Sequence, residues 1–247
     1  MPVDGCDLHV SIRRAEPADA ADAADAPVVV ILHGQFGVGA LFRTFAHAID
    51  DDAATVVLPD LRGRGQSRCD DLASHSWSRL VDDVIAVIDH VGASRAVLAG
   101  SSMGAGLALA TALREPARVA ALVVWALPYA GNRAGWLRGQ RPIMQAAMDT
   151  ARAVLAGGVD PASLPPRWQR HDARSIAVAL VGLGWVQPFD DVDDLRAIAC
   201  PTGVAPGSDD LHPAVFGERC LDVIPSTQRI DDTPAELARF VAAVGRP

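Results

Sequence analysis

A serine flanked by glycines carries the strongest chemical signal in this sequence. Gly100-Ser101-Ser102-Met103-Gly104 matches the pattern G-x-S-x-G, in which the central serine is a nucleophile. Small residues on both sides let the backbone turn sharply between a strand and a helix, so that the serine hydroxyl projects from the turn. The N-terminus of the following helix also favours a developing negative charge. We therefore expect Ser102 to be a catalytic nucleophile.

The segments around Ser102 have the composition that such a turn requires. The apolar run at residues 96–100 predicts a buried strand, and residues 107–113 predict a helix. Further buried strands are predicted at residues 28–32, 55–59 and 119–127. The clearest amphipathic helix covers residues 77–91. This alternation predicts the α/β class, with a mostly parallel, doubly wound sheet.

Two more motifs precede the serine motif along the chain. They are HGQFG at residues 33–37 and DLRGRGQS at residues 60–67. In this order, the three motifs resemble those of the small, single-domain bacterial members of the α/β-hydrolase superfamily. The resemblance covers nearly the whole chain, and it implies the α/β-hydrolase fold.

The resemblance assigns the HGQFG motif to an oxyanion hole. It implies that the backbone N–H groups of Gln35 and Met103 together hold the oxyanion. His33 is interpreted as a structural residue that anchors this loop, in preference to a base. The DLRGRGQS motif is interpreted as a structural turn and receives no chemical role.

The acid of the family follows a later strand in a G-x-x-D pattern. Gly207-Ser208-Asp209-Asp210 supplies this pattern, and the spacing points to Asp210. Asp209 is the alternative. Two aspartates in a polar turn without a chemical role remain a third interpretation.

The histidine that the family carries before its last helix has no counterpart here. No histidine follows His212 in the sequence, and only Asp231-Asp232 joins the predicted last strand to the predicted last helix. The loop that usually carries the histidine is therefore interpreted as deleted. A serine without a base is a poor nucleophile near neutral pH.

Two other histidines are candidate replacements for the missing base. His212 lies two residues after Asp210, although this closeness disfavours a regular Ser–His–Asp line. His171 lies in the segment predicted to cover the site. Chemistry without a complete triad, or binding alone, is the remaining alternative.

The strand rhythm stops between residues 128 and 188. Within a single domain of residues 1–247, this stretch is predicted to be a helical lid over the carboxyl ends of the strands. Its cationic and aromatic residues are Arg133, Arg138, Arg141, Arg152, Arg167, Arg170, Arg174, Trp136, Trp168 and Trp185. They favour either an anionic substrate or an ordinary amphipathic lid with solvated arginines.

Composition limits the classes of function. The net charge of −8 argues against nucleic-acid binding, and no apolar run is long enough to span a membrane. The absence of lysine and the many alanines indicate a GC-rich bacterial source. The four cysteines show no CxxC spacing and are expected to be reduced thiols in a cytoplasmic protein. No metal or other cofactor is expected, and the oligomeric state stays open.

Three functions remain. The first is a serine-dependent hydrolase acting on a small ester, thioester or lactone with an incomplete triad. The second is a non-hydrolytic enzyme on the same scaffold, such as a cyclase or a lyase of secondary metabolism. The third is a non-catalytic binding protein. A histidine imidazole within hydrogen-bonding reach of Ser102 favours the first.

Overall fold

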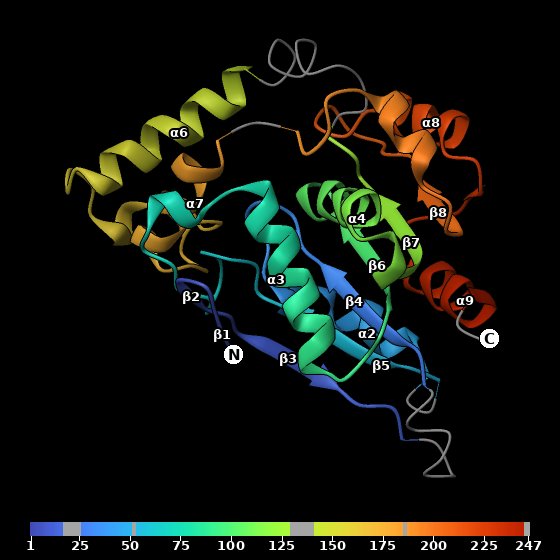
Figure 1. The fold of residues 1–247 in the computed structure, drawn as a ribbon. Coiled ribbons are helices and arrows are strands. Elements are labelled where there is room, and N and C mark those ends of the chain that lie inside the picture. The colour runs from blue at the N-terminus through green and yellow to red at the C-terminus, as the bar shows by residue number, and fades with distance from the viewer. Residues whose placement is uncertain (17–25, 51–52, 129–140, 185–186, 245–247) are drawn as a thin grey trace.

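The core of the molecule is a seven-stranded sheet with helices on both faces (Figure 1). The computed structural model describes residues 1–16, 26–50, 53–128, 141–184 and 187–244. The strand order is β3-β5-β4-β6-β7-β8-β9, and a separate two-stranded sheet pairs β1 with β2. This arrangement confirms the predicted α/β class and the doubly wound sheet.

The strands are short. Their bounds are β1 Pro2–Val3, β2 Cys6–Asp7, β3 Val10–Arg13, β4 Val28–Leu32, β5 Thr55–Pro59, β6 Ala96–Ser101, β7 Val119–Trp125, β8 Thr202–Ala205 and β9 Thr227–Arg229. In the large sheet, β3 pairs antiparallel with β5 at one edge, and the other neighbouring strands pair in parallel. The carboxyl ends of the six parallel strands therefore meet at one edge, where a site can be assembled from several loops.

The apolar runs form central strands because both of their faces are buried. Along β4, Val30 and Leu32 point into one hydrophobic cluster, whereas Val29 and Ile31 point into another. This alternation follows from the two-residue period of a strand. A continuous apolar run, rather than an alternating one, is therefore what such a strand requires.

The helices form two layers. Their bounds are α2 Arg43–Ala48, α3 Trp77–His90, α4 Met103–Arg114, α6 Arg141–Leu155, α7 Ala173–Leu183, α8 Ala214–Val223 and α9 Pro234–Val244. Short 3₁₀ turns are η1 Gly39–Phe42, η2 Leu72–Ser74, η3 Pro116–Arg118, η4 Pro161–Ser163 and η5 Val192–Ala197. Helices α3, α4 and α8 contribute to the first cluster, and α2 and α9 contribute to the second.

Local sequence signals set several helix ends. The Ser76 side chain accepts a hydrogen bond from the Arg79 amide and caps α3, as a serine at this position favours. Gly92 follows the end of α3 with a φ of 81°, a left-handed conformation that glycine adopts without strain. Asp172 caps α7 in the same way as Ser76 caps α3.

The predicted lid segment, residues 128–188, contains a pair of helices beside the sheet. Helices α6 and α7 pack on each other, and a small hydrophobic cluster around Trp168 joins them to Phe36 of the HGQFG motif (Figure 1). Residues 129–140 and 185–186 lie outside the described residues. The described part is helical, as predicted, and its role as a lid stays a prediction.

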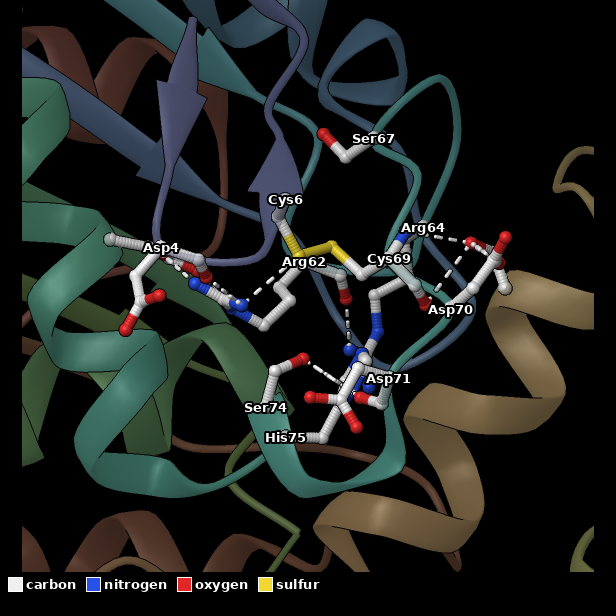
Figure 2. The surroundings of a disulfide bond; sticks show 12 residues. Asp4, Cys6, Arg62, Arg64, Ser67, Cys69, Asp70, Asp71, Ser74 and His75 are labelled. Atoms are coloured by element: carbon white, nitrogen blue, oxygen red, sulfur yellow. Dashed lines mark hydrogen bonds and ion pairs between the residues drawn. A yellow bond between two sulfur atoms is a disulfide. The ribbon is translucent and has the colours of Figure 1, made fainter.

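A disulfide joins the N-terminal sheet to the segment after the DLRGRGQS motif (Figure 2). Cys6 and Cys69 are linked, 63 positions apart in the sequence, whereas Cys200 and Cys220 are free. The prediction of four reduced thiols is therefore wrong for this pair. It relied on the wide spacing, but β2 and residue 68 are brought together by an isolated bridge between Asp7 and Arg68. Because disulfides persist mainly in oxidising compartments, this pair removes one ground for the cytoplasmic prediction.

None of the helices in the described residues has the length and apolar character needed to cross a membrane.

Candidate active site

Ser102 lies at the sharp turn that the sequence predicts. It follows β6, precedes the first residue of α4, and has a φ of 55° and a ψ of −116°. A Cβ on Gly100 would lie 2.3 Å from the Gly104 carbonyl oxygen, and one on Gly104 would lie 2.1 Å from the Leu32 carbonyl oxygen. Both flanking glycines are thus required by close backbone contacts. They hold Ser102 in a backbone conformation that side chains rarely adopt.

The HGQFG loop passes directly beside Ser102. A Cβ on Gly34 would stand 3.3 Å from the Ser102 Cβ, and the Gly37 amide donates to the Gly34 carbonyl to close a turn. As the first residue of α4, Met103 has a backbone N–H without an intrahelical acceptor. The two predicted oxyanion donors, Gln35 and Met103, therefore follow residues that meet at the nucleophile.

His33 anchors this loop and is fixed as a neutral imidazole. The Leu61 amide donates to His33 Nε2 at 2.9 Å, so the proton is on Nδ1, which donates to the Gly34 carbonyl at 2.7 Å. Burial, with a smaller contribution from the positive charge of Arg64, lowers the pKa of His33 to about 3. Both ring nitrogens are engaged away from Ser102. The geometry supports the structural interpretation of His33.

A histidine nevertheless reaches Ser102. His212 Nε2 lies 3.1 Å from Ser102 Oγ, and His212 Nδ1 lies 3.1 Å and 3.2 Å from the two carboxylate oxygens of Asp209. A carboxylate only accepts, so the Nδ1 proton points at Asp209 and Nε2 is left to accept from the serine. The three side chains form a continuous hydrogen-bonded line.

A short turn makes this line compatible with the close spacing of its members. The backbone amides of Leu211 and His212 both donate to Asp209 Oδ1 at 2.8 Å, so the carboxylate also organises the turn that carries the histidine. A Cβ on Gly207 would lie 1.9 Å from the His212 carbonyl oxygen, so the turn folds back onto a glycine. The expectation that the spacing opposes a Ser–His–Asp line did not allow for this turn.

The structure brings Asp209, rather than Asp210, to His212. Residues i and i+3 of a turn face each other, and Asp209 is three residues before His212. Asp210 is exposed, and among the described residues its side chain forms no hydrogen bond with His212. The hydrogen bond from His212 lowers the pKa of the Asp209 carboxyl. Of the two aspartates weighed from the sequence, the geometry therefore favours the alternative, Asp209.

His171 lies elsewhere and has a different function in the structure. Its Nδ1 accepts from the Gly65 amide at 2.8 Å, and its Nε2 donates to the Phe36 carbonyl at 3.3 Å. Burial lowers the pKa of His171 and keeps it neutral. His171 therefore fastens the lid segment to the HGQFG loop and to the DLRGRGQS turn, and its position does not support a role as base.

Four residues connect β9 to α9, and none of them is a histidine. The connection runs from Ile230 to Thr233, as expected from the sequence. In this structure the histidine beside Ser102 instead comes from the segment after β8. Strands β6, β7 and β8 are parallel neighbours in the sheet, so the carboxyl ends of β6 and β8, which precede Ser102 and His212, lie at the same edge.

Several cationic and aromatic residues of the lid segment contact other groups of the protein, and its arginines at positions 170 and 174 are exposed. Trp168 is buried against Phe36, with ring centroids 5.5 Å apart, and the Arg167 guanidinium lies over the Phe36 ring. Arg152 pairs with Asp149. Arg133, Arg138, Trp136 and Trp185 lie outside the described residues. These contacts support the ordinary amphipathic lid rather than an anion pocket.

Sequence reasoning gave no role to Arg64, which the structure places against Gln35 of the HGQFG loop. The side chain is fully buried and donates to the Gln35 carbonyl, to Gln35 Oε1 and to Met103 Sδ. Its position inside the DLRGRGQS motif was visible, but a buried arginine cannot be distinguished from a solvated one by sequence alone.

The comparisons with known proteins agree with this architecture. Residues 27–175 match the family model described as the alpha/beta hydrolase fold. RutD of Variovorax paradoxus, named as a carbamate hydrolase, is 28% identical over 226 residues, covering 81% of this chain and 80% of its own length. RutD of a Caulobacter strain is 29% identical over 227 residues, covering 83% of this chain and 81% of its own length.

Solved structures give the same result for the fold. An esterase of Exiguobacterium antarcticum superposes with a TM-score of 0.70 at 20% identity, covering 98% of this chain and 92% of the other. The enol-lactonase of Burkholderia xenovorans LB400 superposes with a TM-score of 0.67 at 19% identity, covering 98% and 94%. The chain therefore belongs to the α/β-hydrolase family.

Proposed function

We propose that this protein is a serine hydrolase that cleaves small esters, thioesters or lactones. Ser102 is the nucleophile, His212 the base and Asp209 the acid. The observation that carries this proposal is the 3.1 Å contact between Ser102 Oγ and His212 Nε2, with Asp209 on the other ring nitrogen. The names of the esterase and lactonase neighbours are consistent with this class of substrate.

The first half of the reaction forms an acyl-enzyme. Ser102 Oγ attacks the carbonyl carbon while its proton passes to His212 Nε2. The carbonyl oxygen becomes an oxyanion that accepts hydrogen bonds from the N–H groups of Gln35 and Met103. His212 then gives its proton to the leaving oxygen or sulfur as the bond from that atom to the acyl carbon breaks.

The second half returns the free enzyme. Water attacks the acyl carbon while His212 Nε2 takes a proton from it. The tetrahedral intermediate collapses, the bond from Ser102 Oγ to the acyl carbon breaks, and Oγ recovers the proton from His212. For a lactone the released product is the hydroxy acid, since the leaving oxygen remains attached to the acyl group.

Asp209 fixes the imidazole during both halves. Its carboxylate accepts from Nδ1–H, which sets the tautomer with a free Nε2 and stabilises the imidazolium that forms. The side chain is 64% exposed, so water competes for it and weakens this stabilisation. Asp209 therefore contributes orientation more than charge.

The lid segment completes the proposed single domain. We propose that α6 and α7 cover Ser102 from the side of Phe36. The contacts of Trp168 and His171 with the HGQFG loop support this arrangement, because they tie the helical pair to the loop that lies beside the nucleophile.

Turnover of an ester series tests the proposed function. Wild-type protein and Ser102→Ala are compared on p-nitrophenyl acetate, a phenyl thioacetate and γ-butyrolactone, with product formation measured against time. The expected result is turnover of at least one class by wild type and its loss in the variant. A folded wild type that turns over none of the three, or a variant that is as active as wild type, contradicts the proposal.

A further inference from the structure

Two buried arginines in the DLRGRGQS motif have opposite environments. Arg62 is paired with Asp83 through two hydrogen bonds of 2.8 Å and 2.6 Å, and its other contacts lie at Asp4 and Cys6 (Figure 2). Arg64 is equally buried, but its hydrogen bonds within the described residues go to uncharged acceptors. In the part of the chain that the structure describes, Arg62 therefore has an ion-pair partner and Arg64 has none.

Most of the acceptors of Arg64 belong to the two residues assigned to the oxyanion hole. Its Nε and Nη2 donate to the backbone carbonyl and the side-chain Oε1 of Gln35, at 3.3 Å and 2.8 Å. The same Nη2 lies 3.5 Å from Met103 Sδ, and Nη1 donates to the Arg62 carbonyl at 2.6 Å. A single planar guanidinium therefore bridges the HGQFG loop, the first residue of α4 and its own turn.

Among the described residues, Arg64 forms no ion pair with a carboxylate. The neighbouring carboxylate of Asp60 accepts from the Gly39 and Gln66 amides instead. His33, His75 and His171 are each kept neutral by burial, with the charge of Arg64 as a further contribution to their lowered pKa values. Burial lowers the pKa of Arg64 to about 9, which leaves it cationic at neutral pH.

We propose that Arg64 is the positioning residue of the oxyanion hole: it holds Gln35 and Met103 in place relative to each other and puts a positive charge behind the developing oxyanion. This inference rests on the proposed function. A preorganised charge in a site that excludes water stabilises a transition state more than a neutral ground state. Arg64 therefore acts on kcat more than on KM.

The matched test compares substitutions at the two arginines. Arg64→Met removes the charge and the bridge, Arg64→Lys keeps the charge without the fork, and Arg62→Met removes a buried arginine of similar exposure that does not touch the oxyanion loop. Each variant is assayed for kcat and KM on the best ester and for inhibition by an alkyl boronic acid, whose adduct with serine is a tetrahedral anion. The folded fraction is measured for each variant by circular dichroism.

The expected result separates the arginines. Arg64→Met lowers kcat about 10–100-fold and weakens boronate inhibition by the same factor, with KM within about threefold of wild type, because it disturbs donors whose individual loss costs about 10²–10³-fold. Arg64→Lys lies between this variant and wild type. Arg62→Met lowers stability while kcat per folded molecule and boronate affinity stay at wild-type values.

Three outcomes overturn the inference. Equal losses in Arg62→Met and Arg64→Met per folded molecule assign Arg64 to the fold alone, and an unchanged kcat in folded Arg64→Met removes its role altogether. If Arg64→Met does not fold, the single variants Gln35→Leu and Arg64→Lys take its place. A wild-type kcat in both of them also removes the role of Arg64. If the wild type shows neither turnover nor boronate inhibition, the proposed function fails as well. In the other outcomes the wild type is active, and only the inference about Arg64 fails.

Discussion

The two sides of Ser102 are built in contrasting ways. On the side of the HGQFG loop, His33, Arg64 and His171 are buried, and each makes at least one hydrogen bond to a group distant in the sequence. On the other side, Asp209 and His212 stand on one exposed turn and are held by contacts within four residues. The first side is fixed by tertiary structure and the second by a local turn.

This difference indicates how the proposed triad is assembled without a histidine in the connection before the last helix. An oxyanion hole needs two N–H groups from separate segments, so only tertiary packing can hold it. The acid and the base need only a hydrogen bond to each other and an orientation that points the base at the serine. A turn in which residues i and i+3 face each other supplies both. In the proposed triad, the acid and the base therefore share a single turn, and the acid is exposed rather than buried.

The largest expected loss of activity comes from a substitution in the turn that carries Asp209 and His212. His212→Ala removes the proposed base, and we expect kcat/KM to fall about 10³–10⁶-fold, since a serine without its base loses most of its nucleophilicity. Ester turnover measures this. His90→Ala, at the exposed end of α3, is the control and should retain wild-type turnover. A His212→Ala protein with more than a tenth of wild-type activity would refute the local acid–base pair.

Substitution of either aspartate is expected to lower kcat less than His212→Ala does, and comparing the two variants tests which aspartate is the acid. Asp209→Asn removes the negative charge that the imidazolium faces, and we expect kcat to fall about 10–10³-fold, less than for a buried acid because Asp209 is exposed. Asp210→Asn should remain within about twofold of wild type. The measurement is kcat for both variants under the same conditions. A larger loss for Asp210→Asn than for Asp209→Asn contradicts the assignment taken from the turn.

The disulfide tests how far the buried side depends on its covalent anchor. Cys69→Ser opens a link that closes a loop spanning 63 positions, and we expect the free energy of unfolding to fall by about 2–4 kcal/mol. Urea denaturation measures it. Cys200→Ser, at a free and partly buried thiol, is the control and should cost less. Equal midpoints for wild type and Cys69→Ser, with and without a reductant, would show that the link does not form.

The pH dependence of stability reports on the buried histidines. Burial lowers the pKa of His33 to about 3 and that of His75 to about 4. Histidines in the unfolded chain have a pKa near 6.5, so below about that pH the unfolded state binds more protons than the folded state. Their contribution is therefore complete above about pH 6.5 and is lost as the pH falls toward 4, by up to about 1.4 kcal/mol per pH unit for each group.

Replacing one of these histidines tests the sign. Urea denaturation between pH 4.5 and 7.5 should show a shallower slope for His75→Gln than for wild type, whereas His9→Gln serves as the partly exposed control. The raised pKa of Asp83 acts in the opposite direction and is common to all three proteins. If the free energy of unfolding of the wild type rises as the pH falls from 6.5 to 4.5, the buried histidines are not held in the neutral form.

The fold was predictable from the sequence because its signals are local. The apolar run at 28–32 and the serine motif each specify a strand or a turn from a few adjacent residues. The side chains that meet across the fold were harder to predict. The pairing of Cys6 with Cys69, and the burial of Arg64 under Gln35, depend on which segments pack together. The choice between Asp209 and Asp210 depends on the shape of one turn.

The most direct test of the central claim is the rate at which a fluorophosphonate labels Ser102. The wild type, His212→Ala and Asp209→Asn are treated with the probe, the rate constant is measured from the loss of free protein, and the labelled peptide is mapped. The account predicts labelling of the wild type at Ser102, slower labelling of Asp209→Asn, and a loss of about 10³-fold or more in His212→Ala. Labelling of His212→Ala at the wild-type rate, or of the wild type at another residue, would contradict the claim that one exposed turn supplies the base for this serine.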